Sequence, residues 1–158
     1  MNGNNSKKII FKYFSNILDE ITVETMWSEI IDESKGIYRL DNIPFYGPLI
    51  ASGDVFYAEF DRDENTLVFR EVIESSGNSI VQIIIMKDDF NKELLRKELL
   101  DLGCPSEGMN EKYFVAEIPE NINYYVIKSI LDKYENNEII EYAEPILSIK
   151  HQDDILEN

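Results

Sequence analysis

Residues 79–103, which read SIVQIIIMKDDFNKELLRKELLDLG, decide the fold class. The first eight residues are almost continuously apolar, which is the pattern of a central strand covered on both faces. Asp88 or Asp89 is placed to cap the start of a helix, and Gly103 is placed to end it. The helix predicted between them has apolar side chains at helical spacing, namely Phe90, Leu94, Leu95, Leu99 and Leu102. A buried strand therefore leads directly into an amphipathic helix.

The segments after this helix continue with mixed α and β patterns. The pieces CPSEG (104–108) and KYFVAEIP (112–119) predict a hairpin, NYYVIKSILDKYENN (123–137) a second helix, and EIIEYAEPILSI (138–149) a closing strand. The resulting order, β-α-β-β-α-β, is that of the ferredoxin-like arrangement. We therefore expect a ferredoxin-like subdomain over residues 79–149 and a loose tail over residues 150–158.

The part of the chain before residue 79 has a different pattern. Four turn-forming residues at 75–78 (SSGN) predict a boundary, and residues 23–74 contain four or five short segments of strand periodicity joined by turns. This pattern predicts a small, strongly bent sheet or partial barrel, so the expected fold class is α+β. Residues 1–22 are predicted to be an N-terminal extension containing a helix, on the spacing of Ile10, Phe14, Ile17 and Ile21.

The longest turn-rich stretch is GIYRLDNIPFYGPLIASGDVF (36–56). Pro44 and Pro48 fix their own φ and disfavour helix in the residue before each of them. Phe45 and Tyr46 lie between the two prolines, and loop aromatics of this kind commonly fold back over a small core. We interpret the stretch as a structural corner, while a ligand-binding role for residues 41–54 stays open.

The same region carries a resemblance to a known family. The pattern W-x-E, then Y-R-L-D-N-I-P-F, then G-D and an S-G turn is similar to the bacterial domain-of-unknown-function family 4265, over roughly Val23 to Pro145. The matching residues are Trp27, Glu29, Tyr38, Arg39, Leu40, Asp41, Asn42, Ile43, Pro44, Phe45, Gly53, Asp54, Ser76 and Gly77. The resemblance implies the two-part layout but no established activity, cofactor or catalytic residue.

Charge and composition exclude several classes of function. The chain has 31 acidic and 15 basic residues, a formal net charge of −16, which disfavours nucleic acid and anionic lipid as partners. No apolar run is long enough to span a bilayer, so we expect a cytoplasmic protein without a membrane contact. One cysteine and one histidine leave no metal cluster and no disulfide, and we expect no cofactor. Cys104 and His151 are the only candidates for a nucleophilic pair, and we predict that they are not one.

Three functional hypotheses remain, of which the least favoured is an enzyme whose catalytic residues the sequence patterns do not reveal. The first is a non-enzymatic protein that binds a basic protein partner, such as an immunity protein that neutralises a toxin domain; the alternative is a regulatory module that senses a small ligand through the ferredoxin-like half. The first rests on the acidity and on nine tyrosines, a side chain enriched at interfaces. The oligomeric state stays open. The predicted partner-binding residues surround one hairpin: Glu59, Asp61, Asp63, Glu64, Glu71 and Glu74.

Overall fold

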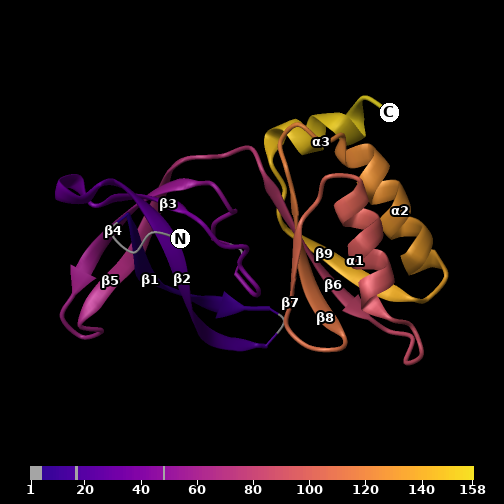
Figure 1. Cartoon of the computed structure of the whole chain (residues 1–158), viewed down its shortest axis with the longest axis horizontal. Coiled ribbons are helices and arrows are strands. Elements are labelled where there is room, and N and C mark those ends of the chain that lie inside the picture. The colour runs from indigo at the N-terminus through magenta and orange to yellow at the C-terminus, as the bar shows by residue number, and fades with distance from the viewer. Residues whose placement is uncertain (1–4, 17, 48) are drawn as a thin grey trace. The chain divides into compact units, whose positions relative to one another are not determined.

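The computed structural model describes residues 5–16, 18–47 and 49–158 as an α+β protein (Figure 1). The chain divides between Ser76 and Gly77 into two compact units. This division lies inside the turn-rich segment 75–78. Each unit has its own hydrophobic core, so each is described by itself.

The first unit is a closed barrel of five strands in the order β1-β2-β3-β4-β5. Neighbouring strands are antiparallel, and the barrel closes where β1 pairs in parallel with β5 at Ile10 and Val68. A short 3-10 helix, Glu33–Lys35, joins β2 to β3, and Gly36 ends it at φ 72°, where a side chain is disfavoured. The strands are β1 (Ser6–Ser15), β2 (Glu20–Asp32), β3 (Ile37–Leu40), β4 (Val55–Asp61) and β5 (Thr66–Glu74).

The N-terminal segment predicted to contain a helix is strand β1, so that prediction was wrong. Ile9, Phe11 and Tyr13 alternate along the strand and are buried in the barrel core. The residues whose spacing suggested a helix point outward instead: Phe14 is 48% exposed and Ile21 is 70% exposed. Ile17 lies outside the described residues. The segment forms a strand rather than a helix because barrel closure gives β1 a hydrogen-bonded partner strand on each side.

The turn-rich loop between β3 and β4 is held by two carboxylates. Glu24 on β2 accepts hydrogen bonds from the backbone amides of Phe45 (2.7 Å) and Tyr46 (3.3 Å). Asp54 at the other end accepts from the amides of Ala51 (3.0 Å) and Ser76 (2.8 Å). Tyr46 packs against the barrel core, whereas Phe45 is only half-buried. Pro48 lies outside the described residues.

The second unit is a four-stranded antiparallel sheet with helices α1 and α2 packed on one face (Figure 1). The strand order is β7-β8-β6-β9, so the apolar strand β6 is central, and it is buried along nearly its whole length. The core between helices and sheet includes Leu95, Leu99, Ile127 and Leu131. The elements are β6 (Ser79–Ile85), α1 (Lys92–Asp101), β7 (Ser106–Gly108), β8 (Tyr113–Ile118), α2 (Tyr124–Asn136) and β9 (Ile140–Ile146).

Helix α1 begins later than the sequence predicted. Its N-cap is Asn91, whose side-chain oxygen accepts from the amide of Glu93, rather than Asp88 or Asp89. Leu94, predicted to be in the apolar stripe, is 63% exposed, whereas Leu95 and Leu99 are fully buried. The end of the helix agrees with the prediction, since Gly103 follows it at φ 96°.

The tail predicted to be loose is helix α3 (Ile149–Leu156). Ser148 caps it, and the Asp154 carboxylate accepts a hydrogen bond from the amide of Tyr124 at the start of α2 (3.0 Å). His151 is completely buried. The sequence did not predict these contacts, because the segment is polar and its partners are far away in the sequence. None of the helices in the described residues combines the length and the apolar character needed to cross a membrane.

Candidate interaction surface

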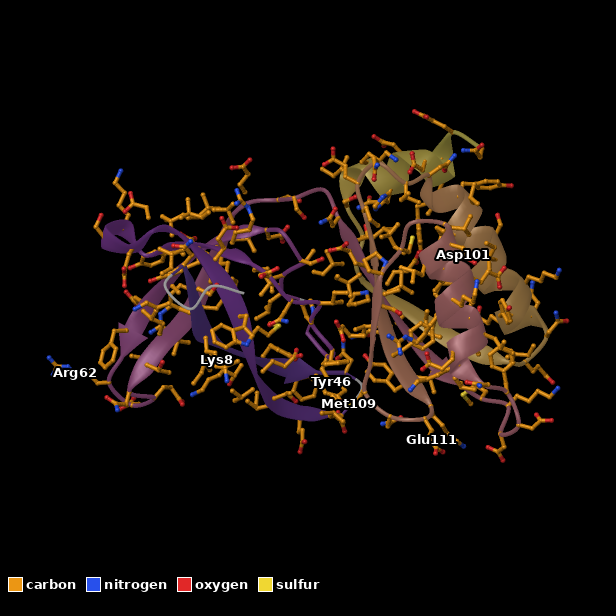
Figure 2. The ribbon with its side chains drawn as sticks, viewed as in Figure 1. Lys8, Tyr46, Arg62, Asp101, Met109 and Glu111 are labelled. Atoms are coloured by element: carbon orange, nitrogen blue, oxygen red, sulfur yellow. The ribbon has the colours of Figure 1, made fainter. Side chains whose placement is uncertain are left out.

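The six predicted partner-binding acids lie on one β-hairpin of the barrel. Glu59 and Asp61 are on β4, Asp63 and Glu64 are in the turn, and the other two are on β5. Cross-strand pairing sets Glu71 opposite Tyr57 and Glu74 opposite Val55. Arg62 extends from the tip of this hairpin away from the barrel (Figure 2). The structure therefore places all six acids on the predicted hairpin, but spreads them along its length.

Half of these carboxylates already have a cationic partner within the unit. Arg70 bridges two of them, with its Nε 2.8 Å from Glu59 and its Nη2 3.1 Å from Asp61. Hydrogen bonding to Arg70 lowers the pKa of both carboxyls. Glu64 pairs with Lys12 of β1. Among the described residues, no ion pair is formed by Asp63, Glu71 or Glu74, nor by the cation Arg62 at the tip, so these three are the hairpin acids without a cationic partner.

The same hairpin exposes apolar side chains among its acids. Phe60 is 59% exposed and Ile73 is 52% exposed. Phe60 alternates along β4 with Phe56 and Ala58, so strand periodicity places it on the same side of the strand as those two residues. Only the latter two are buried, because the barrel core ends at Ala58 and the last residues of β4 run beyond it. Phe60 lies near the turn of the hairpin and Ile73 near its other end, so the hairpin has two separate exposed apolar groups along its length.

A second exposed apolar surface covers the outside of strands β1 and β2, and we call it the β1–β2 face. On β2, alternate residues from Ile21 to Ile31 point outward, including the chain's single tryptophan. The ammonium group of Lys8, which is labelled in Figure 2, lies 5.1 Å from the ring centroid of Trp27, and both residues are exposed. The large apolar members of the face are Phe14, Ile21, Val23, Trp27 and Ile31. Composition alone did not identify this surface, although the alternation of β2 contained the signal.

A hollow of about 460 Å³ joins the two surfaces. Trp27 and Phe60 both line it, together with Lys8. The acidic turn also reaches the β1–β2 face through the ion pair between Glu64 and Lys12. One side of the barrel thus carries two adjoining apolar patches with different electrostatic surroundings.

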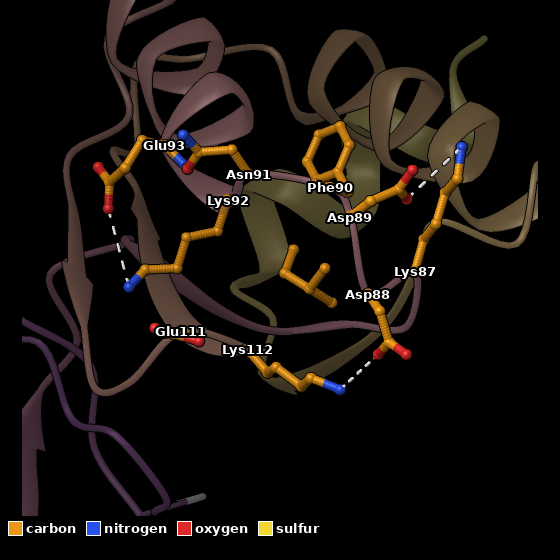
Figure 3. Close-up of a pocket in the computed structure, with 10 residues that line it drawn as sticks. Lys87, Asp88, Asp89, Phe90, Asn91, Lys92, Glu93, Glu111 and Lys112 are labelled. Atoms are coloured by element: carbon orange, nitrogen blue, oxygen red, sulfur yellow. Dashed lines mark hydrogen bonds and ion pairs between the residues drawn. The ribbon is translucent and has the colours of Figure 1, made fainter.

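The second unit has a hollow of about 430 Å³ beside the start of α1 (Figure 3). The segment from Lys87 to Glu93 forms most of its wall, and Ile85, Glu111 and Lys112 complete it. Each of its three lysines already lies near a carboxylate, most closely Lys112, whose Nζ is 2.7 Å from Asp88. An anionic ligand would have to displace these contacts.

Cys104 and His151 are not arranged as a nucleophile and its base. Burial raises the pKa of the Cys104 thiol to about 11, which keeps it protonated and unreactive at neutral pH. His151 Nδ1 lies 2.6 Å from the Ser79 hydroxyl, and its Nε2 lies 3.0 Å from the carbonyl oxygen of Pro119. Both ring nitrogens are therefore engaged in buried contacts. Within the described part of the chain, no three potential ligand residues gather closely enough to hold a metal ion.

These features define a two-unit α+β protein whose prominent surface features are exposed apolar patches on a small barrel. Residues 24–142 match the family described as Domain of unknown function (DUF4265), and the chain belongs to that family. This confirms the resemblance carried by the sequence pattern between Trp27 and Gly77.

A solved structure has a similar fold. A hypothetical protein from Neisseria gonorrhoeae, known from a crystal structure, is 25% identical in sequence and superposes with a TM-score of 0.77. The similarity covers 91% of this chain and 96% of that one. No curated protein matches the chain in sequence.

Proposed function

We propose that this is a non-enzymatic protein that binds a basic protein partner through the β4–β5 hairpin. The observation that supports it most is the exposure of Phe60 and Ile73 among six carboxylates on one hairpin. Apolar side chains at the centre of a contact supply affinity, and charges at its rim supply steering and specificity. A partner that fits this surface contacts Phe60 near the turn and Ile73 near the other end with apolar groups, and meets the acids along the hairpin with cations.

The three carboxylates without an ion pair are the groups that we expect to attract a basic partner. Asp63, Glu71 and Glu74 are free to meet cations of the partner, whereas Glu59 and Asp61 first have to share or release Arg70. The net charge of −16 adds a long-range attraction that ionic strength weakens. A cytosolic immunity protein that neutralises a basic toxin domain is the specific form of this function that we favour.

The test is capture of the partner followed by measurement of its association rate. The tagged protein is used to isolate partners from the source cell, and mass spectrometry identifies them. Association is then measured at several salt concentrations for the wild type and for a variant carrying Asp61→Asn, Asp63→Asn and Glu64→Gln. The first of these changes retains a side-chain carbonyl for the turn amides that Asp61 now binds at 2.9 and 3.2 Å.

We expect a rate that falls as salt rises and that is lower for the hairpin variant at low salt. The matched control carries Glu107→Gln, Asp153→Asn and Glu157→Gln, which removes the same charge from exposed sites of the second unit. A partner with an acidic surface, or a rate indifferent to both salt and the hairpin acids, would overturn the proposal.

A second candidate is a regulatory module that senses a small ligand through the second unit. The hollow of about 430 Å³ beside α1 favours it, because its size suits a small metabolite. This candidate includes the proposal that the unit is ferredoxin-like, which is supported by the element order β6-α1-β7-β8-α2-β9 and the strand order β7-β8-β6-β9. Native mass spectrometry of the protein purified without dialysis tests it: a bound small molecule lost in Lys112→Ala supports it, and a bare chain mass counts against it.

A further inference from the structure

We propose that the free edge of strand β9 binds an extended basic segment of a partner protein, which adds to the sheet as a further strand. This edge belongs to the second unit, so the inference does not depend on the β4–β5 hairpin. The edge of a sheet presents unpaired amides and carbonyls, and these groups are matched by the backbone of another strand. In the described part of the chain, the closed barrel has no such edge, whereas the open sheet has two, β7 and β9.

Strand β9 turns half of its backbone groups away from the sheet. The amide of Met86 donates to the carbonyl oxygen of Ile139 (2.8 Å), so Ile139 faces β6. Backbone groups of alternate residues point to opposite sides of a strand, so those of Glu141 also face β6, whereas those of Ile140 and Tyr142 face outward. No other described residue forms a backbone hydrogen bond with these outward groups.

The other edge strand, β7, is shorter and is already covered by a side chain. It has three residues, Ser106–Gly108, and Arg96 donates to both the hydroxyl (2.8 Å) and the carbonyl oxygen (3.1 Å) of Ser106. Strand β9 offers residues 140–144 before Pro145, which has no amide hydrogen. The longer of the two edges is therefore the one that can accept another strand.

A hollow of about 470 Å³ beside the start of β9 indicates the chemistry of the added strand. Its apolar lining comes from Met86 and from Ile140 and Tyr142, the two residues whose backbone groups face outward. The charged residues of its lining are all glutamates: Glu135, Glu138 and Glu141. None of the three forms an ion pair with another described residue. A lysine or arginine side chain fits this hollow, because its aliphatic stem packs on apolar groups while its charged end stays among carboxylates.

A second copy of this chain fits the same edge poorly. Pairing β9 with β9 would bring a second set of the three glutamates to the edge, and the lining of the hollow contains no cation to separate the two sets. Lys128 of α2 reaches β9, but its ammonium group already lies 2.8 Å from the Tyr142 hydroxyl and 3.4 Å from the Glu144 carboxylate. The added strand is therefore a segment of a different protein.

The position of the hollow determines which residues of that segment are basic. The side chains of Ile140 and Tyr142 pack into the core on the helix side of the sheet. In antiparallel pairing, two residues that exchange backbone hydrogen bonds carry their side chains on the same face. The residues that bond to Ile140 and Tyr142 therefore carry the basic side chains. The residues between them turn their backbone groups away from β9.

Titration of the full chain with a synthetic peptide tests the proposal. The peptide is the acetylated and amidated heptapeptide TKVKVKT, in which lysines alternate with residues that favour strands. Calorimetry measures its affinity. At saturation, hydrogen exchange at the amides of Ile140 and Tyr142 should slow by about tenfold or more. The amides of Glu141 and Ala143, which already face β6, should change much less.

Two N-methylated forms of the peptide separate strand pairing from simple attraction of charge, because both keep every lysine. N-methylation of the last two lysines removes hydrogen-bond donors to β9 and should weaken binding about tenfold or more. N-methylation of the two valines removes donors that point away from β9 and should weaken binding much less.

Variants of the protein test the hollow. Glu135→Gln with Glu141→Gln should weaken binding of the unmodified peptide, because two of the carboxylates around the lysine are lost. The matched control, Asp153→Asn with Glu157→Gln, removes the same charge from exposed positions near the C-terminus and should bind the peptide like the wild type. The hairpin variant described under the proposed function should also bind it like the wild type, so the two proposals fail independently.

Three results would overturn the inference. One is the absence of peptide binding up to about 1 mM. Another is equal binding of the two N-methylated forms, or the reverse order, because neither agrees with lysines that pair with β9. The third is slow exchange of Ile140 and Tyr142 in the protein alone, with a sedimenting mass of twice 18.4 kDa, because a second copy would then occupy the edge.

Discussion

The Nδ1 atom of His151 lies 2.6 Å from the hydroxyl oxygen of Ser79, a residue 72 positions away in the chain. The Ser79 oxygen also accepts a hydrogen bond from the amide of Ser148 at 2.9 Å, so its proton is available to His151. The Nε2 atom faces the Pro119 carbonyl at 3.0 Å, which fits a proton on that nitrogen. Neutral His151 therefore ties helix α3 both to strand β6 and to the residue that follows β8.

This contact predicts that α3 loosens in mild acid. Burial lowers the pKa of His151, so the unfolded chain takes up its proton first, near its ordinary value of about 6.5. The corresponding stability is complete above about pH 6.5 and is lost as the pH falls toward the lower pKa of the folded state. Lys150 and Asp154 of the same helix oppose each other in this shift, and the packed Tyr124 ring adds to the burial.

Hydrogen exchange of the α3 amides between about pH 7.5 and 5.5 measures this effect, after correction for the intrinsic pH dependence of exchange. Carboxylates with ordinary pKa values stay ionised in that window, and His151 is the only histidine. We expect protection of α3 to fall in the wild type and to be independent of pH in His151→Gln. Equal protection of α3 at both pH values in the wild type would contradict the prediction.

A second prediction concerns the loop between β3 and β4. Glu24→Ala removes the acceptor for the amides of Phe45 and Tyr46 and for the Tyr13 hydroxyl. An unsatisfied buried donor costs about 1–3 kcal/mol, and these hydrogen bonds are partly buried, so urea unfolding should show a loss within that range. Glu24→Gln keeps one carbonyl acceptor and should lose less. Equal losses in the two variants would show that the side chain fills space rather than holds the loop.

A third prediction is that the Cys104 thiol reacts slowly in the native protein. The residue is completely buried, and a pKa raised to about 11 leaves a very small thiolate fraction at pH 8. A thiol-specific chromogenic disulfide should therefore react at the rate at which the second unit opens, and at once in denaturant. Rapid stoichiometric reaction in native buffer would revive Cys104 as a functional nucleophile.

The sequence predicted those parts of the fold whose patterns are local and have a single period. The buried strand β6 and the second helix, α2, were predicted correctly, because the apolar residues of each segment fit one period only. On α2 that period buries Tyr124, Ile127 and Leu131. Strand β1 was missed because its apolar residues fit two periods. Only its pairing with β2 and β5 decides which residues face inward.

The candidate site was predictable to a similar extent. Alternation and turn residues placed the six acids on one hairpin correctly. Their neutralisation was not predictable, because Lys12 reaches Glu64 from the other end of the barrel sequence and Arg70 bridges two residues on the opposite strand. Helix α3 was missed for a related reason: its buried histidine is satisfied by Ser79 and Pro119, and a polar tail gives no local sign of such partners.

The last prediction concerns Arg70, whose replacement changes the charge of the hairpin. Its guanidinium holds Glu59 and Asp61 together, and hydrogen bonding to these acids raises its own pKa. Arg70→Gln removes that cation and leaves both carboxylates without a cationic partner. If the β4–β5 hairpin binds a basic protein, this variant should associate faster than the wild type at low salt, and the two rates should converge at high salt.

Lys97→Gln, which frees exposed Asp101 on α1 in the same way, should change the rate much less. Stopped-flow measurement with the captured partner compares the three proteins. A slower association rate for Arg70→Gln would mean that the partner needs Arg70 itself or the side-chain geometry that Arg70 imposes. An association rate equal to that of Lys97→Gln would mean that electrostatic steering depends on the net charge of the chain and not on this hairpin.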